Sequence, residues 1–152
     1  MMRRDFGLAC LTLAAGPVPV LAAARPMGVL YKNPQCSCCE AHADYLRQYG
    51  YQIEVKPSFD LVAIKRQSGV PETLDGCHTM LIGGYVVEGH VPAGAIDRLL
   101  AERPVIKGIS VPGMPAGSPG MLAPGEQQQL LTVYEISTDP ASGATPKVFG
   151  VM

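Results

Sequence analysis

Three cysteines fall within four residues of this chain, in the segment Cys36-Ser37-Cys38-Cys39. Successive side chains point in different directions on any backbone, so ordinary core packing does not account for all three thiols. Thiolates bind soft metals such as Cu(I) and Zn(II), and they are also the nucleophiles of disulfide exchange. The segment therefore indicates either metal capture or thiol redox chemistry.

The residues around the thiols predict the elements that hold them. An apolar run at 27–31 is followed by a polar break at 32–35, and an amphipathic run at 40–49 is stopped by Gly50. A strand, a loop and then a helix with cysteines at its start is the arrangement of thioredoxin. The partial positive charge at a helix N-terminus promotes ionisation of a thiol placed there.

Further elements follow from periodicity and from turn residues. They are a strand at 51–56, a helix at 61–67 with Asp60 as its N-cap, a strand at 79–82, a turn at Gly83-Gly84, a strand at 85–90 and a helix at 93–102. The order β-α-β-α-β-β-α predicts an α/β, thioredoxin-like domain over residues 25–105. Its early strands are expected to be parallel and its last two to form a hairpin.

The sequence changes character after residue 106. Residues 108–121 are rich in Gly and Pro and carry no charge, whereas 132–136 and 147–151 look like two strands. We therefore predict a Gly/Pro/Met-rich C-terminal extension over residues 106–152 that ends in a short β-hairpin. Because the loop is flanked by structure on both sides, it is expected to lie over the domain and the metal site as a lid.

The N-terminus has the pattern of an export signal. Met1-Met2-Arg3-Arg4 precedes an apolar run from Phe6 to Ala24, and we place the cleavage site after Ala24, so that residues 1–24 are the signal peptide. The paired arginines partly match the twin-arginine signal. We expect a periplasmic protein with no membrane association once the signal is removed. A formal net charge of -1 gives no indication of nucleic-acid binding.

Residues distant from the triplet complete the candidate site. Cys77 and His78 directly precede the predicted strand 79–82, where a thioredoxin-like fold places a residue opposite the cysteine loop. Cys77 is thus a fourth candidate thiol ligand, with a buried core cysteine as the alternative. His78 and His90 are candidate imidazole ligands, with structural hydrogen bonding as the alternative. His42 is expected at the surface.

Two methionines complete the candidate ligands. Met114 and Met121 flank a Pro- and Gly-rich stretch that has little other apolar content. Thioethers on such a stiff loop are soft ligands suited to Cu(I). The alternative is that they are flexible apolar plugs that hold the loop down.

Several motifs together resemble the CopG-type periplasmic copper-resistance proteins. They are Cys36-x-Cys38-Cys39, Gly69-Val70-Pro71, Cys77-His78-Thr79, Gly84-Tyr85, Glu88-Gly89-His90-Val91-Pro92-Ala93 and the run from Val111 to Met121. The resemblance covers residues 27–122. It implies a thioredoxin domain with a C-terminal extension that helps to bind metal, a cysteine-centred copper site, and a role in copper redox handling before export.

The chain departs from that family at three positions. Ser37 stands where the family usually has Gly, His42 where it usually has Trp, and Leu122 where it usually has an acidic residue. A side chain at position 37 narrows the approach to the thiols, whereas His42 either adds a ligand or changes the packing. None of these departures removes a thiol.

Copper binding is the function that the sequence favours. The expected ligands are Cys36, Cys38, Cys39 and Cys77, completed by Met114, Met121, His78 or His90. When several Cu(I) ions share the thiolates, they neutralise the negative charge of the sulfur atoms, which favours a thiolate-bridged cluster. The imidazoles also suit Cu(II). We expect a copper exporter or chaperone as the partner. Whether the chain is a copper oxidoreductase or only a sequestering protein is left open.

A thiol-disulfide oxidoreductase that uses Cys36 and Cys39 is the alternative function. It leaves the other two thiols and the methionine loop unexplained. Structural zinc sites and iron–sulfur sites are disfavoured, because the spacings of one residue and none between the thiols are too short for them.

Overall fold

A computed structural model describes residues 24–139 and 145–152 of the chain. The predicted signal peptide therefore lies outside the described residues, apart from Ala24 itself. The elements are β1 (Gly28–Lys32), α1 (Ser37–Gln48), β2 (Ile53–Pro57), α2 (Leu61–Gln67), the 3-10 helix η1 (Glu72–Leu74), β3 (His78–Ile82), β4 (Tyr85–Glu88), α3 (Ala93–Glu102), β5 (Gly108–Ser110), β6 (Thr132–Ile136) and β7 (Val148–Val151). No helix within this part of the chain combines the length and the apolarity needed to cross a bilayer.

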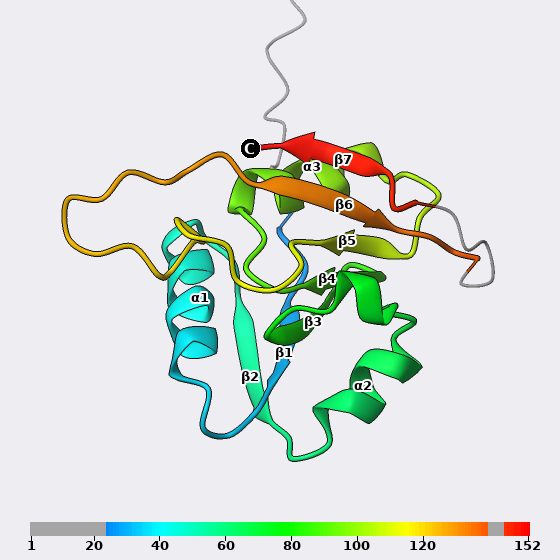
Figure 1. Cartoon of the computed structure of the whole chain (residues 1–152), viewed down its shortest axis with the longest axis horizontal. Helices are drawn as coiled ribbons and strands as arrows, with labels where there is room; N and C mark the ends of the chain where they lie inside the picture. Colours follow the sequence, from blue (N-terminus) through cyan, green and yellow to red (C-terminus); the bar gives the residue numbers. More distant parts are fainter. Residues whose placement is uncertain (1–23, 140–144) are drawn as a thin grey trace, which may run out of the picture.

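The strands form one sheet in the order β2-β1-β3-β4-β5-β6-β7 (Figure 1). β1 and β2 are parallel, and β3 and β4 form the predicted hairpin around Gly83-Gly84. β6 and β7 are antiparallel, as predicted for the end of the chain. The structure thus confirms an α/β, thioredoxin-like fold.

One strand was not predicted. β5 lies in the Gly/Pro-rich stretch that was expected to be loop, and it pairs parallel to β4 and antiparallel to β6. The terminal hairpin is therefore a continuation of the main sheet. Gly108 permits this pairing, because a Cβ there would lie 1.9 Å from the carbonyl oxygen of Val86.

The two faces of the sheet are covered differently. α1 and α3 pack on one face, where Leu46 and Leu99 are fully buried against Leu30, Met80 and other core residues. On the opposite face Leu74, Val86 and Ile136 form a smaller cluster. Because side chains alternate along a strand, His78 faces α1 together with Met80, while Thr79 faces the other side.

Candidate metal centre

The cysteines lie where β1 leads into α1. Cys36 is the N-cap residue of α1, and Cys38 and Cys39 belong to its first turn, so the helix begins three residues earlier than the predicted start at Glu40. Cys36 and Cys39 form a disulfide with their Cα atoms 5.6 Å apart. Cys38 and Cys77 are free thiols. The sulfur of Cys38 lies 3.2 Å from that of Cys36.

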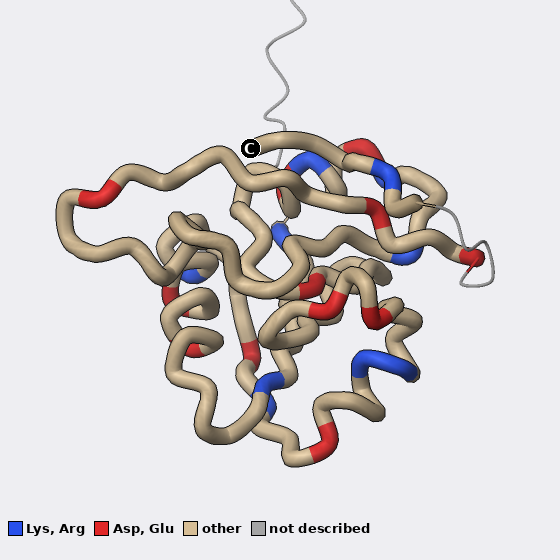
Figure 2. Tube along the Cα trace, in the orientation of Figure 1, with Lys and Arg blue, Asp and Glu red and all other residues tan. Residues whose placement is uncertain are grey.

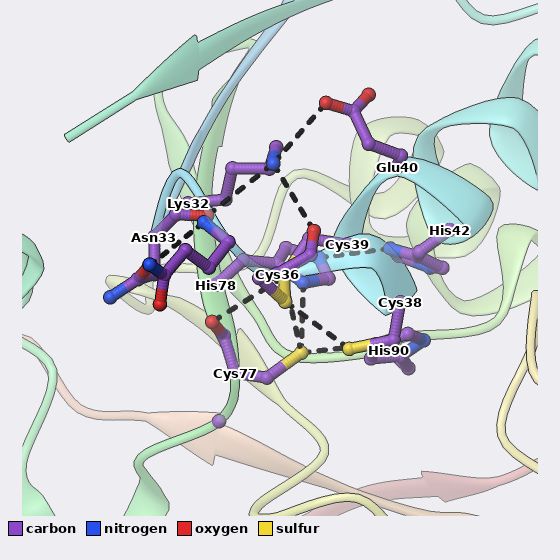
Figure 3. Close-up of a disulfide and its surroundings, with 12 residues drawn as sticks. Lys32, Asn33, Cys36, Cys38, Cys39, Glu40, His42, Cys77, His78 and His90 are labelled. Carbon is purple, nitrogen blue, oxygen red and sulfur yellow. Dashed lines mark hydrogen bonds and ion pairs between the residues drawn. A yellow bond between two sulfur atoms is a disulfide. The ribbon is translucent and has the colours of Figure 1, made fainter.

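Cys77 faces the triplet, as predicted. Its sulfur lies 3.7 Å from the Cys39 sulfur, and the four cysteines offer sulfur atoms that all lie within 4.8 Å of one another. Figure 3 shows Cys77 reaching this group from the segment that precedes β3. The fold therefore brings sulfur from two distant parts of the sequence into one cluster.

Two imidazoles approach the same sulfur. His78 Nδ1 lies 3.2 Å and His90 Nε2 lies 3.0 Å from Cys77 Sγ. Both rings are fully buried. His90 follows Gly89, which has a φ of 74° and whose Cβ, if present, would lie 2.4 Å from the Val111 carbonyl oxygen. A second group of ligand atoms thus consists of Cys77, His78 and His90.

His42 was expected at the surface, and this prediction is wrong. It lies on the inner face of α1 with Cys39, Ala43 and Leu46, and its side chain is fully buried. Its spacing of three from Cys39 and four from Leu46 places it on one helical stripe, which the sequence could have revealed. Where the family usually has Trp, His42 was expected either to add a ligand or to change the packing. Both of its nitrogens are hydrogen-bonded within the core, so His42 acts through packing.

Burial keeps the Cys77 thiol and the three imidazoles in their uncharged forms. Burial raises the pKa of the Cys77 thiol to about 12, and the neighbouring Cys38 thiol adds to the rise. Burial also lowers the pKa of His42 to about 3, and it lowers the pKa of His78 well below the ordinary value. The pKa of His90 falls for the same reason. At neutral pH the thiol keeps its proton and the rings are uncharged.

A buried lysine holds the loop before the cysteines. Lys32, 3% exposed, donates to the carbonyl oxygens of Asn33, Pro34 and Cys36 at 3.1 to 3.3 Å and pairs with Glu40 at 3.3 Å (Figure 3). This role of Lys32 was not predicted from the sequence. The alternation of β1 gives the signal, because Lys32 falls on the same face as the buried Leu30.

A buried acid-base pair holds the segment around Cys77. The Glu88 carboxylate, fully buried on β4, accepts from the Gly76 amide at 2.8 Å and from the Thr79 hydroxyl at 2.7 Å, and it pairs with Lys65. Burial raises the pKa of Glu88, and the Lys65 charge opposes that rise. The residues before and after the Cys77-His78 pair are thus fixed by one carboxylate.

The loop between β5 and β6 reaches the centre through a hydrogen bond to His90 and also packs on α1. Residues 108–125 carry no charged side chain, and the tube of Figure 2 is correspondingly tan there. The carbonyl oxygen of Pro119 accepts from His90 Nδ1 at 2.8 Å. A Cβ at Gly120 would lie 2.8 Å from the backbone of Ala41 and His42, so the loop packs closely on α1.

The two methionines lie elsewhere on this loop. Met114 and Met121 are 49% and 43% exposed. They line a cavity of about 450 Å³ together with Glu126, Gln127, Gln129 and neighbouring loop residues. No cysteine or histidine is among the residues that line it.

Comparison with known proteins identifies the relatives of this arrangement. Two solved structures described as the copper resistance protein copG, in forms 2 and 1, match with TM-scores of 0.73 and 0.72 and with sequence identities of 33% and 34%. Each comparison covers 84% of this chain and 98% of the other. This chain belongs to the CopG family of copper-resistance proteins.

Other comparisons agree with this assignment. A family model described as "Protein of unknown function, DUF411" matches residues 74–121, which in this CopG-family chain run from the end of η1 to Met121. A search of curated protein sequences gave no significant match. The resemblance inferred from the motifs is thereby confirmed.

Proposed function

We propose that this CopG-family protein binds copper as its cargo at the cysteine-histidine centre and interconverts Cu(I) and Cu(II) in copper resistance. One observation carries the proposal. The Cys77 sulfur lies within 3.7 Å of the Cys39 sulfur and within 3.2 Å of both the His78 and the His90 ring nitrogens. Cys77 therefore belongs to two groups of ligand atoms at once.

The two groups differ in the oxidation state that they favour. The four sulfurs of Cys36, Cys38, Cys39 and Cys77 are soft donors, which suit Cu(I). The group of one sulfur and two imidazole nitrogens also accommodates Cu(II). A copper ion next to Cys77 can thus change oxidation state with a small change of ligands. Thiolates shared between ions support a multinuclear cluster, because four thiolates on one ion would carry a large negative charge.

The disulfide sets the redox state in which the centre loads. With Cys36 and Cys39 joined, the complete set of thiolates is not available. Two electrons and two protons convert the disulfide into two thiols, for which a dithiol reductant is a suitable source. In the reverse direction the two thiols reduce two Cu(II) ions to two Cu(I) ions, forming the disulfide and releasing two protons.

The proposed localisation and partner are supported by the sequence and by the related proteins. The N-terminal signal pattern and the copper-resistance relatives support export to the periplasm, by the twin-arginine route, and delivery to a copper exporter or chaperone. Met114 and Met121 are proposed as additional soft ligands, since their loop also carries the Pro119 carbonyl that contacts His90.

A thiol-disulfide oxidoreductase is the second candidate. Cys36 and Cys39 form a disulfide at the N-terminus of a helix in a thioredoxin-like fold, which is the arrangement of that class. Such an enzyme would need only these two thiols, and Cys38 and Cys77 would have no part in its chemistry.

Replacement of Cys77 separates the two functions. Anaerobically reduced wild type, Cys77→Ser and Cys36→Ser would be loaded with Cu(I), and the bound copper and the insulin-reduction rate measured. Copper binding predicts that Cys77→Ser and Cys36→Ser both lose copper. An oxidoreductase predicts that only Cys36→Ser loses reductase activity. Wild type that takes up no copper but reduces insulin rapidly would overturn the proposed function.

A further inference from the structure

Both ring nitrogens of His42 have partners inside the core. His42 Nε2 lies 3.0 Å from the carbonyl oxygen of Val91, and His42 Nδ1 lies 2.9 Å from His78 Nε2. Figure 3 shows His42 on α1 directed toward His78. His42 is fully buried and belongs to neither group of ligand atoms. It contacts the centre through His78, which lies between His42 and the Cys77 sulfur.

These contacts determine where the protons of the two rings are. A carbonyl oxygen only accepts, so His42 Nε2 carries the proton that is donated to Val91. In a neutral ring the other nitrogen is then an acceptor, and His42 Nδ1 must receive the proton of His78 Nε2. His78 Nδ1 is left with a free lone pair, and this atom lies 3.2 Å from the Cys77 sulfur.

His90 reaches the same result without an intermediate residue. Its Nδ1 donates directly to the carbonyl oxygen of Pro119, which leaves a lone pair on Nε2 at 3.0 Å from Cys77 Sγ. The Cys77 thiol has one proton and can satisfy only one of the two lone pairs. The other lone pair therefore faces the sulfur without a proton to accept, as a metal ligand would.

We propose that His42 is a positioning residue that fixes His78 in the tautomer and orientation in which its Nδ1 atom binds copper. This inference rests on the proposed copper-binding function. A ligating histidine usually donates its other N–H to a carboxylate, a carbonyl or water, and that partner sets the tautomer. Here the His42 imidazole accepts the other N–H of His78, and His42 is itself oriented by the Val91 carbonyl.

Two substitutions separate this positioning from simple filling of the core. His42→Phe keeps an aromatic ring but removes the acceptor for His78 Nε2. His42→Gln supplies an oxygen and a nitrogen joined through one carbon, in place of the two ring nitrogens that the imidazole joins through one carbon. Because Val91 can only accept, the Gln amide nitrogen should face Val91 and the Gln oxygen should face His78.

The first measurement needs no copper. Long-range ¹H–¹⁵N correlation spectra of ¹⁵N-labelled, copper-free protein report which nitrogen of each histidine is protonated. We expect His78 to be protonated only at Nε2 in wild type and in His42→Gln. In His42→Phe we expect His78 to exchange between the two neutral tautomers, one protonated at Nδ1 and the other at Nε2. A wild-type His78 protonated at Nδ1 would overturn the inference, and so would a His42→Phe spectrum identical to wild type. If His42→Phe does not fold, the spectra of wild type and His42→Gln decide.

The second measurement uses Cu(II) itself. We expect His42→Phe to bind Cu(II) about 10- to 100-fold more weakly, the usual cost of losing the partner of a ligating histidine, with recovery in His42→Gln. Pulsed electron paramagnetic resonance should show one imidazole fewer in the His42→Phe complex. Equal affinity and equal imidazole number in all three proteins would refute the positioning role. Wild type that binds no copper would instead refute the proposed function, while its tautomers could still be as predicted.

Discussion

Acid should destabilise the copper-free protein, because its histidines are buried in the neutral form. The chain has three histidines, and all of them lie in this cluster. The ordinary pKa of 6.5 applies in the unfolded chain, whereas in the folded protein the pKa of His42 is lowered to about 3 and that of His78 well below 6.5. The neutral rings therefore stabilise the fold fully above pH 6.5, and this stabilisation is lost as the pH falls below that value.

The size of the effect follows from proton linkage. At pH 5 a histidine that stays neutral in the fold but titrates normally in the unfolded chain costs about 2 kcal/mol of unfolding free energy. His42 alone therefore costs about 2 kcal/mol, a substantial share of the roughly 5 to 15 kcal/mol that domains possess, and the lowered pKa of His78 acts in the same direction. Glu88 acts in the opposite sense, because burial raises its pKa and its protonation at low pH relieves a cost.

Urea unfolding followed by circular dichroism at pH 7.5 and pH 5 measures this loss. His42→Gln is the matched reference, since it removes one titrating ring and keeps the two hydrogen-bonding partners. The stability difference between wild type and this variant should shift by about 2 kcal/mol between the two pH values, in favour of the variant at pH 5. Parallel pH curves for the two proteins would show that His42 is not a buried neutral group.

Three further outcomes are expected. Glu88→Gln should lower the unfolding free energy by about 3 kcal/mol in urea titrations, because it removes the buried charged partner of Lys65 and leaves only the half-exposed Asp75 carboxylate; an unchanged midpoint would contradict the pairing with Glu88. Gly120→Ala should lower the melting temperature by several degrees, because the residue has a φ of 83° and its Cβ would press on the backbone of α1; unchanged melting would show that the loop is not docked there. Replacing Met114 and Met121 together by Leu should weaken Cu(I) binding in a competition assay, and unchanged stoichiometry and affinity would exclude them as ligands.

Local patterns were sufficient for most of the fold. α2 and α3 have the predicted bounds, since Asp60 caps α2 through the Ala63 amide and four apolar residues of α3 share one face. β5 could not be predicted in this way. It has only three residues in a glycine- and proline-rich stretch, and its position depends on pairing with β4 and β6, which are distant in sequence.

The site was predicted only in part, because some of its contacts also join segments that are distant in sequence. Cys77 was placed opposite the triplet from the fold pattern, and the structure confirms this. The hydrogen bonds that orient His78 and His90 were not predictable, because their partners are a second ring and the backbone carbonyl of Pro119. A carbonyl is present at every residue, so the sequence carries no mark of the one that is used.

The centre draws on residues that are far apart along the chain, from Cys36 in the N-terminal third to Pro119 in the C-terminal third. In a polypeptide made from its N-terminus, the triplet emerges long before the groups that complete its surroundings. Non-local contacts of this kind form late. Metal ions captured by the nascent triplet would thus meet an unfinished environment, so the metal content of the mature protein depends on whether folding or loading comes first.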